Sequence, residues 1–286
     1  MTTYALTGAT GQLGAITIGE LAARIGAENV VALVRDPARL SEWAARGVRV
    51  RLCDFDRPET LGPALAGVDR LLLIAGNAVG ARVAQHDAVI AAAKAAGVSL
   101  IAYTSILRAP TCPIALAADH RATEAALAAS GVPHVLMRHG WYADNYTAGL
   151  AAALDSGQIL GAAGEGRISA ASRADMAAGD ATALIESKGG EIYEISGDSA
   201  FTMAEFAAEV ARQAGRPVRY VNLPQAEYVA ALEQAGLPDF IARMLGDSSF
   251  QTSKDVLYDT SGDLSRLIGR PTEPIAAVIA RALGQT

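Results

Sequence analysis

The stretch that decides the fold runs from Thr3 to Gly14 and reads TYALTGATGQLG. Its first part, Tyr4 to Thr7, is a short apolar run typical of a buried strand. Glycines follow at once, as Gly8, Gly11 and Gly14, ahead of a segment with helical periodicity. A strand, a glycine-rich turn and a helix, in this order, indicate a nucleotide-binding unit.

The physical need for these glycines is specific. One permits the sharp turn, a second lets the backbone approach a pyrophosphate, and a third lets the helix pack close to the sheet. The phosphates then meet free N–H groups at the N-terminus of the helix. A tight loop without a ligand is the alternative, but the GxxGxxG spacing directly after a strand favours dinucleotide binding.

Length, hydrophobic content, net charge and cysteine count limit the classes of protein to which the chain can belong. A chain of 286 residues with 51% hydrophobic content is long and apolar enough for one large domain or two intimate ones. The net charge of −6 argues against nucleic acid as a partner, because a phosphate backbone calls for a concentrated basic face. We expect a cytoplasmic protein without a signal peptide or membrane span. Cys53 and Cys112 are too few for a disulfide framework and are expected to be packing residues.

Predicted strands alternate with Ala-rich helical segments through the first half of the chain. After the first strand we expect strands at Val30–Val34, Val48–Leu52, Arg70–Ala75, Leu100–Thr104 and His134–Arg138, and a later one at Glu191–Ile195. Such alternation predicts an α/β fold, a Rossmann-like doubly wound parallel sheet with helices on both faces. The ligand should lie across the carboxyl ends of the strands.

Arg35, at the end of the second strand, bears on the choice of cofactor. A protein that prefers NAD usually places an acid there to hold the ribose 2′-hydroxyl, whereas an arginine suits a 2′-phosphate, so the sequence favours NADPH. Asp36 is the competing acid. The Asp36-Pro37 pair, however, also has the chemistry of a helix N-cap followed by proline in the first turn.

Two further strand ends carry candidate contacts to the adenosine half of the cofactor. Asp54 could accept from the adenine amino group while Phe55 lies against its ring; a loop acid and a packed aromatic are the alternative. Ala75, Gly76 and Asn77 are small residues that would let the adenosine and ribose pass close to the backbone.

Several segments carry a resemblance to a known family. TGATGQLG, VRDP, AAKAAGV followed by IAYTS, and RHGWYADNY resemble the NmrA-like atypical short-chain dehydrogenase/reductases, nearly end to end. The similarity is greatest to the bacterial zinc-free NADPH:quinone oxidoreductases, with triphenylmethane dye reductases as near relatives. The resemblance implies NADPH as hydride donor and a smaller C-terminal substrate domain. By motif position it implies cofactor contacts at Gly8, Ala9, Thr10, Gly11, Gln12, Leu13, Arg35, Ala75, Gly76, Asn77, His139, Gly140, Trp141, Tyr142, Ala143 and Asp144.

The chain departs from the larger superfamily at the catalytic pair. Most members place Tyr-xxx-Lys on the helix after the fifth strand, with a glutamate four residues beyond; Glu124 as landmark puts Leu116 at the tyrosine and His120 at the lysine. The usual proton donor is therefore missing. His120 could reach the nicotinamide ribose or a substrate oxygen, or be an ordinary solvent-facing histidine. Ser105 occupies the position of a substrate-binding serine, or only terminates the strand.

The absence of the tyrosine narrows the range of acceptors that the protein is expected to reduce. Hydride addition to an ordinary ketone creates a strongly basic alkoxide, but a quinone becomes a hydroquinone anion whose conjugate acid has a phenol-like pKa of about 10. Catalysis would then depend on orientation. The aromatic rings of RHGWYADNY could cover nicotinamide and a planar substrate, with Tyr142 or Asn145 addressing its oxygen, or could simply pack in the core.

The second half of the chain changes character. From Phe201 onward it is expected to be mainly helical, broken by Gly and Pro pairs, and GQILGAAGEGRIS is expected to be a loop at the pocket border. We assign 1–141, with 167–200, to an NADP-binding domain, and 142–166 with 201–286 to a smaller, mainly helical substrate lobe. Arg173 is a candidate cofactor contact; a helix-end charge pair with Asp175 and a tether between the lobes are alternatives.

Two functions follow as hypotheses. The first is an NADPH-dependent reductase of quinones or similar planar conjugated acceptors. The second is a non-catalytic NADP-binding sensor, because Leu116 removes the usual tyrosine. The expected partners are a small planar substrate and a second copy in a homodimer, with neither nucleic acid nor membrane. The four histidines are spaced in a way that predicts no metal site.

Overall fold

The computed structural model describes residues 1–78 and 80–285, and it divides into two compact units. The first comprises Met1–Ala109, Asp119–His139 and Arg173–Tyr193; the second comprises Pro110–Ala118, Gly140–Ser172 and the chain from Glu194 onward. The division made from the sequence differs in that it kept 110–118, 140–141, 167–172 and 194–200 with the first unit. Thr286, the last residue of the expected substrate lobe, lies outside the described residues.

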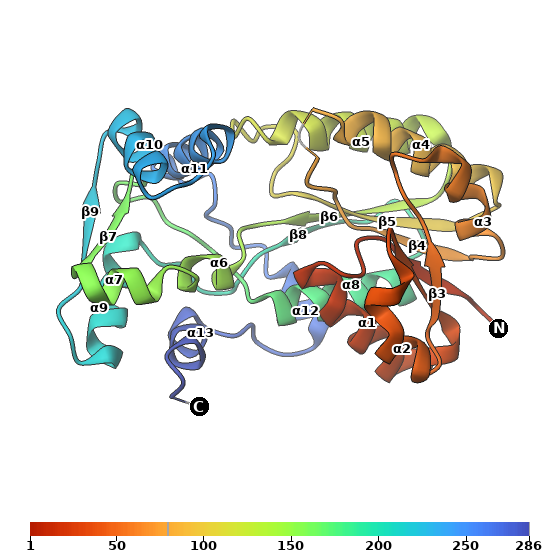
Figure 1. Ribbon diagram of the computed structural model, residues 1–286, viewed down its shortest axis with the longest axis horizontal. Coiled ribbons are helices and arrows are strands. Elements are labelled where there is room, and N and C mark those ends of the chain that lie inside the picture. Colours follow the sequence, from red (N-terminus) through yellow and green to blue (C-terminus); the bar gives the residue numbers. More distant parts are fainter. Residues whose placement is uncertain (79, 286) are drawn as a thin grey trace. The chain divides into compact units, whose positions relative to one another are not determined.

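A seven-stranded parallel sheet organises the first unit (Figure 1). Its strands are β1 (Tyr4–Leu6), β2 (Val30–Val34), β3 (Arg49–Leu52), β4 (Arg70–Leu73), β5 (Leu100–Ile106), β6 (His134–His139) and β8 (Ile192–Ile195), in the order β3-β2-β1-β4-β5-β6-β8. Ala5 of β1 pairs with Val31 on one side and Leu71 on the other. All seven strands were expected from the sequence to within two residues, and the predicted Rossmann-like fold is confirmed.

Helices cover both faces of this sheet. In Figure 1, α3 (Leu61–Leu65), α4 (Arg82–Ala95) and α5 (Ala117–Ser130) lie over one face, and α1 (Gln12–Ile25), α2 (Ser41–Ala45) and α8 (Arg173–Glu186) over the other. Short 3-10 helices follow α1, β2 and β3 as η1 (Ala27–Asn29), η2 (Pro37–Leu40) and η3 (Pro58–Thr60). Strand β2 is apolar on both sides and buried throughout, whereas the edge strand β3 is exposed or half-buried.

The second unit is mainly helical and holds a small sheet. Its helices are α6 (Ala143–Thr147), α7 (Leu150–Ser156), α9 (Met203–Ala214), α10 (Gln225–Gln234), α11 (Asp239–Thr252), α12 (Asp263–Ile268) and α13 (Ile275–Ala282). Strands β7 (Gln158–Gly161) and β9 (Arg219–Asn222) pair in parallel. The expectation of a loop over GQILGAAGEGRIS is therefore wrong for its first residues. A strand this short is defined by its partner, which lies some sixty residues away in the sequence.

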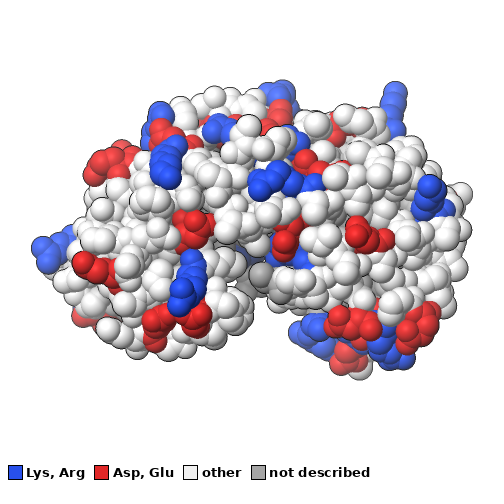
Figure 2. Space-filling view, turned by 90° about the horizontal axis from the view of Figure 1, so that it is seen from above, with Lys and Arg blue, Asp and Glu red and all other residues white. Residues whose placement is uncertain are grey.

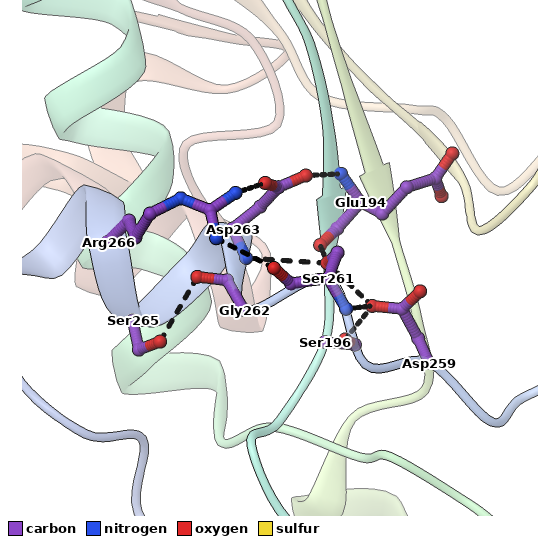
Figure 3. A network of polar contacts seen from close by, with 8 residues as sticks. All are labelled: Glu194, Ser196, Asp259, Ser261, Gly262, Asp263, Ser265 and Arg266. Carbon is purple, nitrogen blue, oxygen red and sulfur yellow. Dashed lines mark hydrogen bonds and ion pairs between the residues drawn. The ribbon is translucent and has the colours of Figure 1, made fainter.

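A polar network anchors the C-terminal segment of the second unit (Figure 3). The carboxylate of Asp259 accepts hydrogen bonds from the Ser196 hydroxyl at 2.7 Å and from the hydroxyl of Ser261 at 2.7 Å. Asp263 accepts from the backbone N–H of Glu194 at 2.9 Å. These bonds tie the turn before α12 to the end of β8, where the backbone would otherwise leave buried polar groups unpaired.

Surface charge, the hydropathy of the helices and the placement of metal-binding side chains bear on which partners the protein could have. On the face shown in Figure 2, Lys and Arg side chains are interspersed with Asp and Glu and do not gather in one basic patch. Among the residues that the structure describes, no helix is both long and apolar enough to cross a membrane. Within 1–78 and 80–285, no group of three or more His, Cys, Asp or Glu is placed to hold a metal ion.

Two glycines of the N-terminal turn serve the fold itself. Gly8 has φ of +62°, a conformation that side chains with a Cβ rarely adopt. A Cβ on Gly14 would lie 2.3 Å from the carbonyl oxygen of Gly8, far inside contact distance. Helix α1 can therefore start directly against the turn only because position 14 is glycine.

We predict that Gly14→Ala lowers the free energy of unfolding by about 1–3 kcal/mol, the usual cost of overpacking. Gly19→Ala is the control in the same helix, because its Cβ would meet the Trp43 ring at an ordinary 3.7 Å. This control should leave stability unchanged or raise it by about 0.5–1 kcal/mol. Urea unfolding without cofactor measures both, and equal stabilities of the two variants would contradict the packing role of Gly14.

Candidate functional site: a dinucleotide cavity

A cavity of about 420 Å³ opens at the carboxyl ends of β1 to β4, within the first unit. It is lined by Gly8, Thr10, Gly11, Leu33, Val34, Arg35, Arg39, Cys53, Asp54, Phe55, Asp56, Ile74, Ala75, Gly76, Asn77, Ala78 and Gln85. Because β1 lies between β2 and β4, chain connections diverge on either side of it. This is the crevice in which open α/β sheets bind their ligands.

The glycine turn forms the floor of the cavity. The Gly11 N–H donates to the Gly8 carbonyl at 2.8 Å, which closes the turn, and Gly11 then serves as N-cap of α1. Because glycine has no side chain to cap the helix, the first-turn amide groups are left for another acceptor. Gly8, Thr10 and Gly11 line the cavity, and Ala9, Gln12 and Leu13 complete the turn and first turn of the helix. An uncapped helix start beside a cavity fits a pyrophosphate.

Two arginines lie at the β2 edge of the cavity. Arg35 and Arg39 both line it, and both are exposed. Asp36 is the N-cap of η2 and accepts from the Ala38 N–H at 3.1 Å, so the predicted capping role is confirmed. Arg39 is a cavity residue that was not predicted from the sequence. The turn that Asp36-Pro37 begins brings Arg39 back to the cavity four residues after Arg35, and that spacing was visible in the sequence.

The opposite wall comes from the ends of β3 and β4. Asp54 and Phe55 line the cavity beside Gln85 of α4. Thr104 of β5 accepts from the Ala75 N–H at 2.8 Å, which fixes the chain as it leaves β4. Cys53 also lines the cavity, and burial raises the pKa of its thiol to about 12.

His120 is not the solvent-facing histidine that the sequence left open. It is buried on α5, and its Nδ1 lies 2.9 Å from the hydroxyl of Tyr103, a fully buried side chain of β5. Burial, with help from the Arg82 cation, lowers the pKa of His120 to about 3. His120 is thus neutral at physiological pH.

Ser105 lies inside β5 and does not terminate it. Its hydroxyl donates to Oε1 of Glu124 at 2.6 Å. Arg138 grips the same carboxylate, with Nε 3.0 Å from Oε1 and Nη2 2.8 Å from Oε2. The proton of Ser105 is therefore committed to Glu124, whereas its oxygen can still accept.

Other candidate residues lie outside the cavity. The His139 ring is buried against α8, with Nε2 2.8 Å from Oδ1 of Asp180, so a cofactor contact would have to come from its main chain. Arg173 is the first residue of α8. The candidates Gly140, Trp141, Tyr142, Ala143, Asp144 and Asn145 belong to the second unit, and their roles stay predictions.

The aromatic segment RHGWYADNY serves packing at one position. Tyr146 contacts the rings of Phe201 and Phe206, with centroids 5.6 and 6.0 Å away. Its ring belongs to an aromatic cluster of the second unit, which is the alternative that the sequence left open. Tyr142 precedes it as N-cap of α6, and its backbone pairs with Ala171 in an isolated bridge.

Comparison with known proteins places this geometry in context. Quinone oxidoreductase 2 of Escherichia coli is 48% identical over 277 residues, covering 96% of this chain and 97% of the relative. The crystal structure of the NADPH-dependent quinone oxidoreductase from Escherichia coli, complexed with NADPH, superposes with a TM-score of 0.96 at 48% identity, covering 98% of this chain and 100% of the other. Triphenylmethane reductase of Citrobacter sp. gives a TM-score of 0.94 at 33% identity, with 99% of each chain covered.

A family model described as NAD(P)H-binding matches residues 8–186, which include the glycine turn and every residue of the cavity. This match covers more than half of the chain and the relatives extend it to nearly the full length. The expected resemblance to quinone and dye reductases is confirmed, and the chain belongs to the NAD(P)H-binding family.

Proposed function

We propose that this protein is an NADPH-dependent oxidoreductase that transfers hydride to a quinone or a similar planar conjugated acceptor. The observation that carries the proposal is the cavity at the β1–β4 crevice, with an uncapped helix start on one side and two arginines on another. Near-identity of fold and length with a quinone oxidoreductase solved with NADPH supports the same conclusion.

The residues of the cavity fit the cofactor part by part. The Gly8–Gly11 turn and the first amide groups of α1 would hold the pyrophosphate, and Arg35 with Arg39 would hold the 2′-phosphate. Asp54 and Phe55 would bind the adenine. NADPH, when bound, supplies the hydride; the protein supplies orientation and excludes water.

The buried histidine explains why a quinone suits this protein. His120 is neutral and Ser105 already donates to Glu124, so neither replaces as an acid the superfamily tyrosine, whose position Leu116 occupies. A hydroquinone anion needs no strong acid, because its conjugate acid has a pKa of about 10, as for a phenol. Positioning of the acceptor then determines the rate.

A non-catalytic NADP-binding sensor is the second candidate, and Leu116 at the tyrosine position is the observation that favours it. The two functions differ in one measurement, the loss of NADPH absorbance with a panel of quinones and cationic dyes. We expect turnover with both classes. Tight NADPH binding without oxidation by any acceptor would favour the sensor.

Some expectations stay predictions within this proposal. These are the assignment of the second unit to substrate binding, the cytoplasmic location, the homodimer and membership of the atypical short-chain dehydrogenase/reductases. The chemistry proposed above depends on none of them.

We predict that Arg35→Ala weakens NADPH binding about 10- to 100-fold, the value of charge-assisted hydrogen bonds to a phosphate, while NADH binding is unchanged. Arg57→Ala is the control, because Arg57 is exposed and lies outside the cavity. Calorimetric titration with both cofactors gives the ratio. An unchanged NADPH/NADH ratio in Arg35→Ala would show that Arg35 does not read the 2′-phosphate.

Gly11→Val should abolish NADPH binding in a folded protein. A Cβ at this position lies 3.1 Å from the Gly8 oxygen, so the turn needs only a small shift, but the side chain occupies the space of the pyrophosphate. Gly149→Val, which meets no atom within 4 Å and lies outside the cavity, should bind normally. Circular dichroism verifies folding and calorimetry measures binding; retained affinity in Gly11→Val would mean that the phosphates lie elsewhere.

For turnover, we predict that Tyr142→Ala or Asn145→Ala lowers kcat/KM for a quinone about 10- to 100-fold through loss of alignment. His120→Ala should have a smaller effect, mainly on NADPH affinity. Because the pKa of His120 is about 3, it does not titrate between pH 5.5 and 8.5, and its removal should leave the pH profile of kcat in that range unaltered. A collapse of quinone reduction in His120→Ala, with dye reduction and NADPH affinity intact, would identify His120 as the proton donor instead.

A further inference from the structure

The main chain of Gly76, in the wall of the cavity, is held on both sides of its Cα by side chains of α4. Its N–H donates to Nε2 of His86 at 3.2 Å, and its carbonyl oxygen accepts from Nε of Arg82 at 2.6 Å. Both side chains are buried, His86 completely. Because the N–H and the carbonyl of Gly76 belong to successive peptide groups, these two bonds restrict the backbone on both sides of a residue that has no side chain to restrain it.

The surroundings of His86 determine which of its nitrogens accepts. Nδ1 of His86 lies 3.0 Å from the hydroxyl oxygen of Thr123, and that hydroxyl donates to the Asp119 carbonyl at 3.0 Å. The Thr123 oxygen must therefore accept, so the proton of His86 is on Nδ1 and Nε2 is free to accept from Gly76. Burial, and then the Arg82 cation, lower the pKa of His86 to about 4, which keeps the imidazole neutral.

His86 also touches a second wall of the same cavity. Its ring meets the edge of Phe55, with centroids 6.4 Å apart at 84°. Phe55 lines the cavity beside Asp54, whereas Gly76 lines it at the end of β4. One buried side chain thus contacts both sides of the space that the adenosine half of the cofactor would fill.

The guanidinium of Arg82 binds the carbonyl oxygen of Gly76. The carboxylate of Asp119 is 3.8 Å from Nη1, too far for a hydrogen bond, and among the described residues the buried Nη1 has no hydrogen-bond partner. The short Nε bond to Gly76 is therefore a principal polar contact of this guanidinium. Burial of a cation costs free energy, and the hydrogen bond to Gly76 offsets part of that cost.

The protein alone does not require glycine at position 76. A Cβ there would meet only Gln85 and His86, each at an ordinary 3.8 Å, and its φ lies outside the left-handed region. What glycine provides at this position is an open surface for a ligand that approaches the backbone closely. The restrained backbone and the missing side chain thus both favour a ligand that lies close to the main chain of Gly76.

We propose that His86 is a positioning residue for cofactor binding: with Arg82 it fixes the main chain of Gly76, and with Phe55 the facing wall, in the geometry that NADPH requires. This inference rests on the proposed function, because NADPH is the ligand for which the cavity is prepared. It assigns a role to two buried side chains that are not among the residues lining the cavity.

The test compares two variants of His86. Glutamine can place its Oε1 where Nε2 lies and accept from Gly76, whereas leucine fills the space but cannot accept. We expect His86→Leu to weaken NADPH binding about 3- to 10-fold, the value of one neutral hydrogen bond, and His86→Gln to remain within about 2-fold of the wild type. Amide hydrogen exchange of the protein without cofactor should show Gly76 exchanging about 10-fold faster in His86→Leu.

Thr123→Val is the independent variant, because it removes the acceptor that keeps the proton on Nδ1. Thr252→Val is its matched control: both threonines are buried on helices and donate to the carbonyl four residues earlier, but only Thr123 meets His86. We expect faster Gly76 exchange and weaker NADPH binding in Thr123→Val only. This pair carries the test if His86→Leu does not fold.

Three results would overturn the inference: unchanged Gly76 exchange and NADPH affinity in His86→Leu, equal impairment in His86→Gln, or equal behaviour of the two threonine variants. Absence of NADPH binding by the wild type is a different failure, because it removes the proposed function. The exchange rates at Gly76 would still show whether His86 holds the peptide.

Discussion

The fold depends on one close approach, between Gly14 of α1 and the carbonyl of Gly8. Because no Cβ separates them, the helix begins immediately after the turn that follows β1. The partial positive charge of the helix N-terminus therefore lies at the point where the strand order reverses. The proposed pyrophosphate site follows from where this helix begins.

Around this floor the site is built in two layers with different chemistry. The layer that faces the cavity combines exposed arginines with small residues, one aromatic ring and the buried side chains of Leu33, Val34 and Cys53. The layer behind it is buried and contains two neutral histidines on either side of Tyr103, whose ring centroid lies 5.6 Å from that of His86 and 5.9 Å from that of His120. A neutral imidazole there can fix a backbone or an adjoining hydroxyl without bringing a buried charge to the reaction.

The sequence was sufficient for the sheet, the glycine turn and the Asp36 cap because local signals determine them. Periodicity defines strands, and the dipeptide Asp36-Pro37 defines its own cap. It was insufficient where the partner is distant in the chain: β7 needs β9, and the link from His86 through Tyr103 to His120 joins α4, β5 and α5. Taken singly, each histidine offered no pattern to interpret, since burial and partners arise only on folding.

The buried thiol at Cys53 has a chemical consequence for an enzyme that handles electrophiles. Quinones arylate proteins by conjugate addition, and the attacking species is the thiolate. Cys53 lines the cavity, yet it is only 4% exposed and its pKa is raised to about 12, so it remains a protonated thiol at physiological pH. The protein thus holds sulfur beside its ligand cavity in a form that resists alkylation by the class of compound it is proposed to reduce.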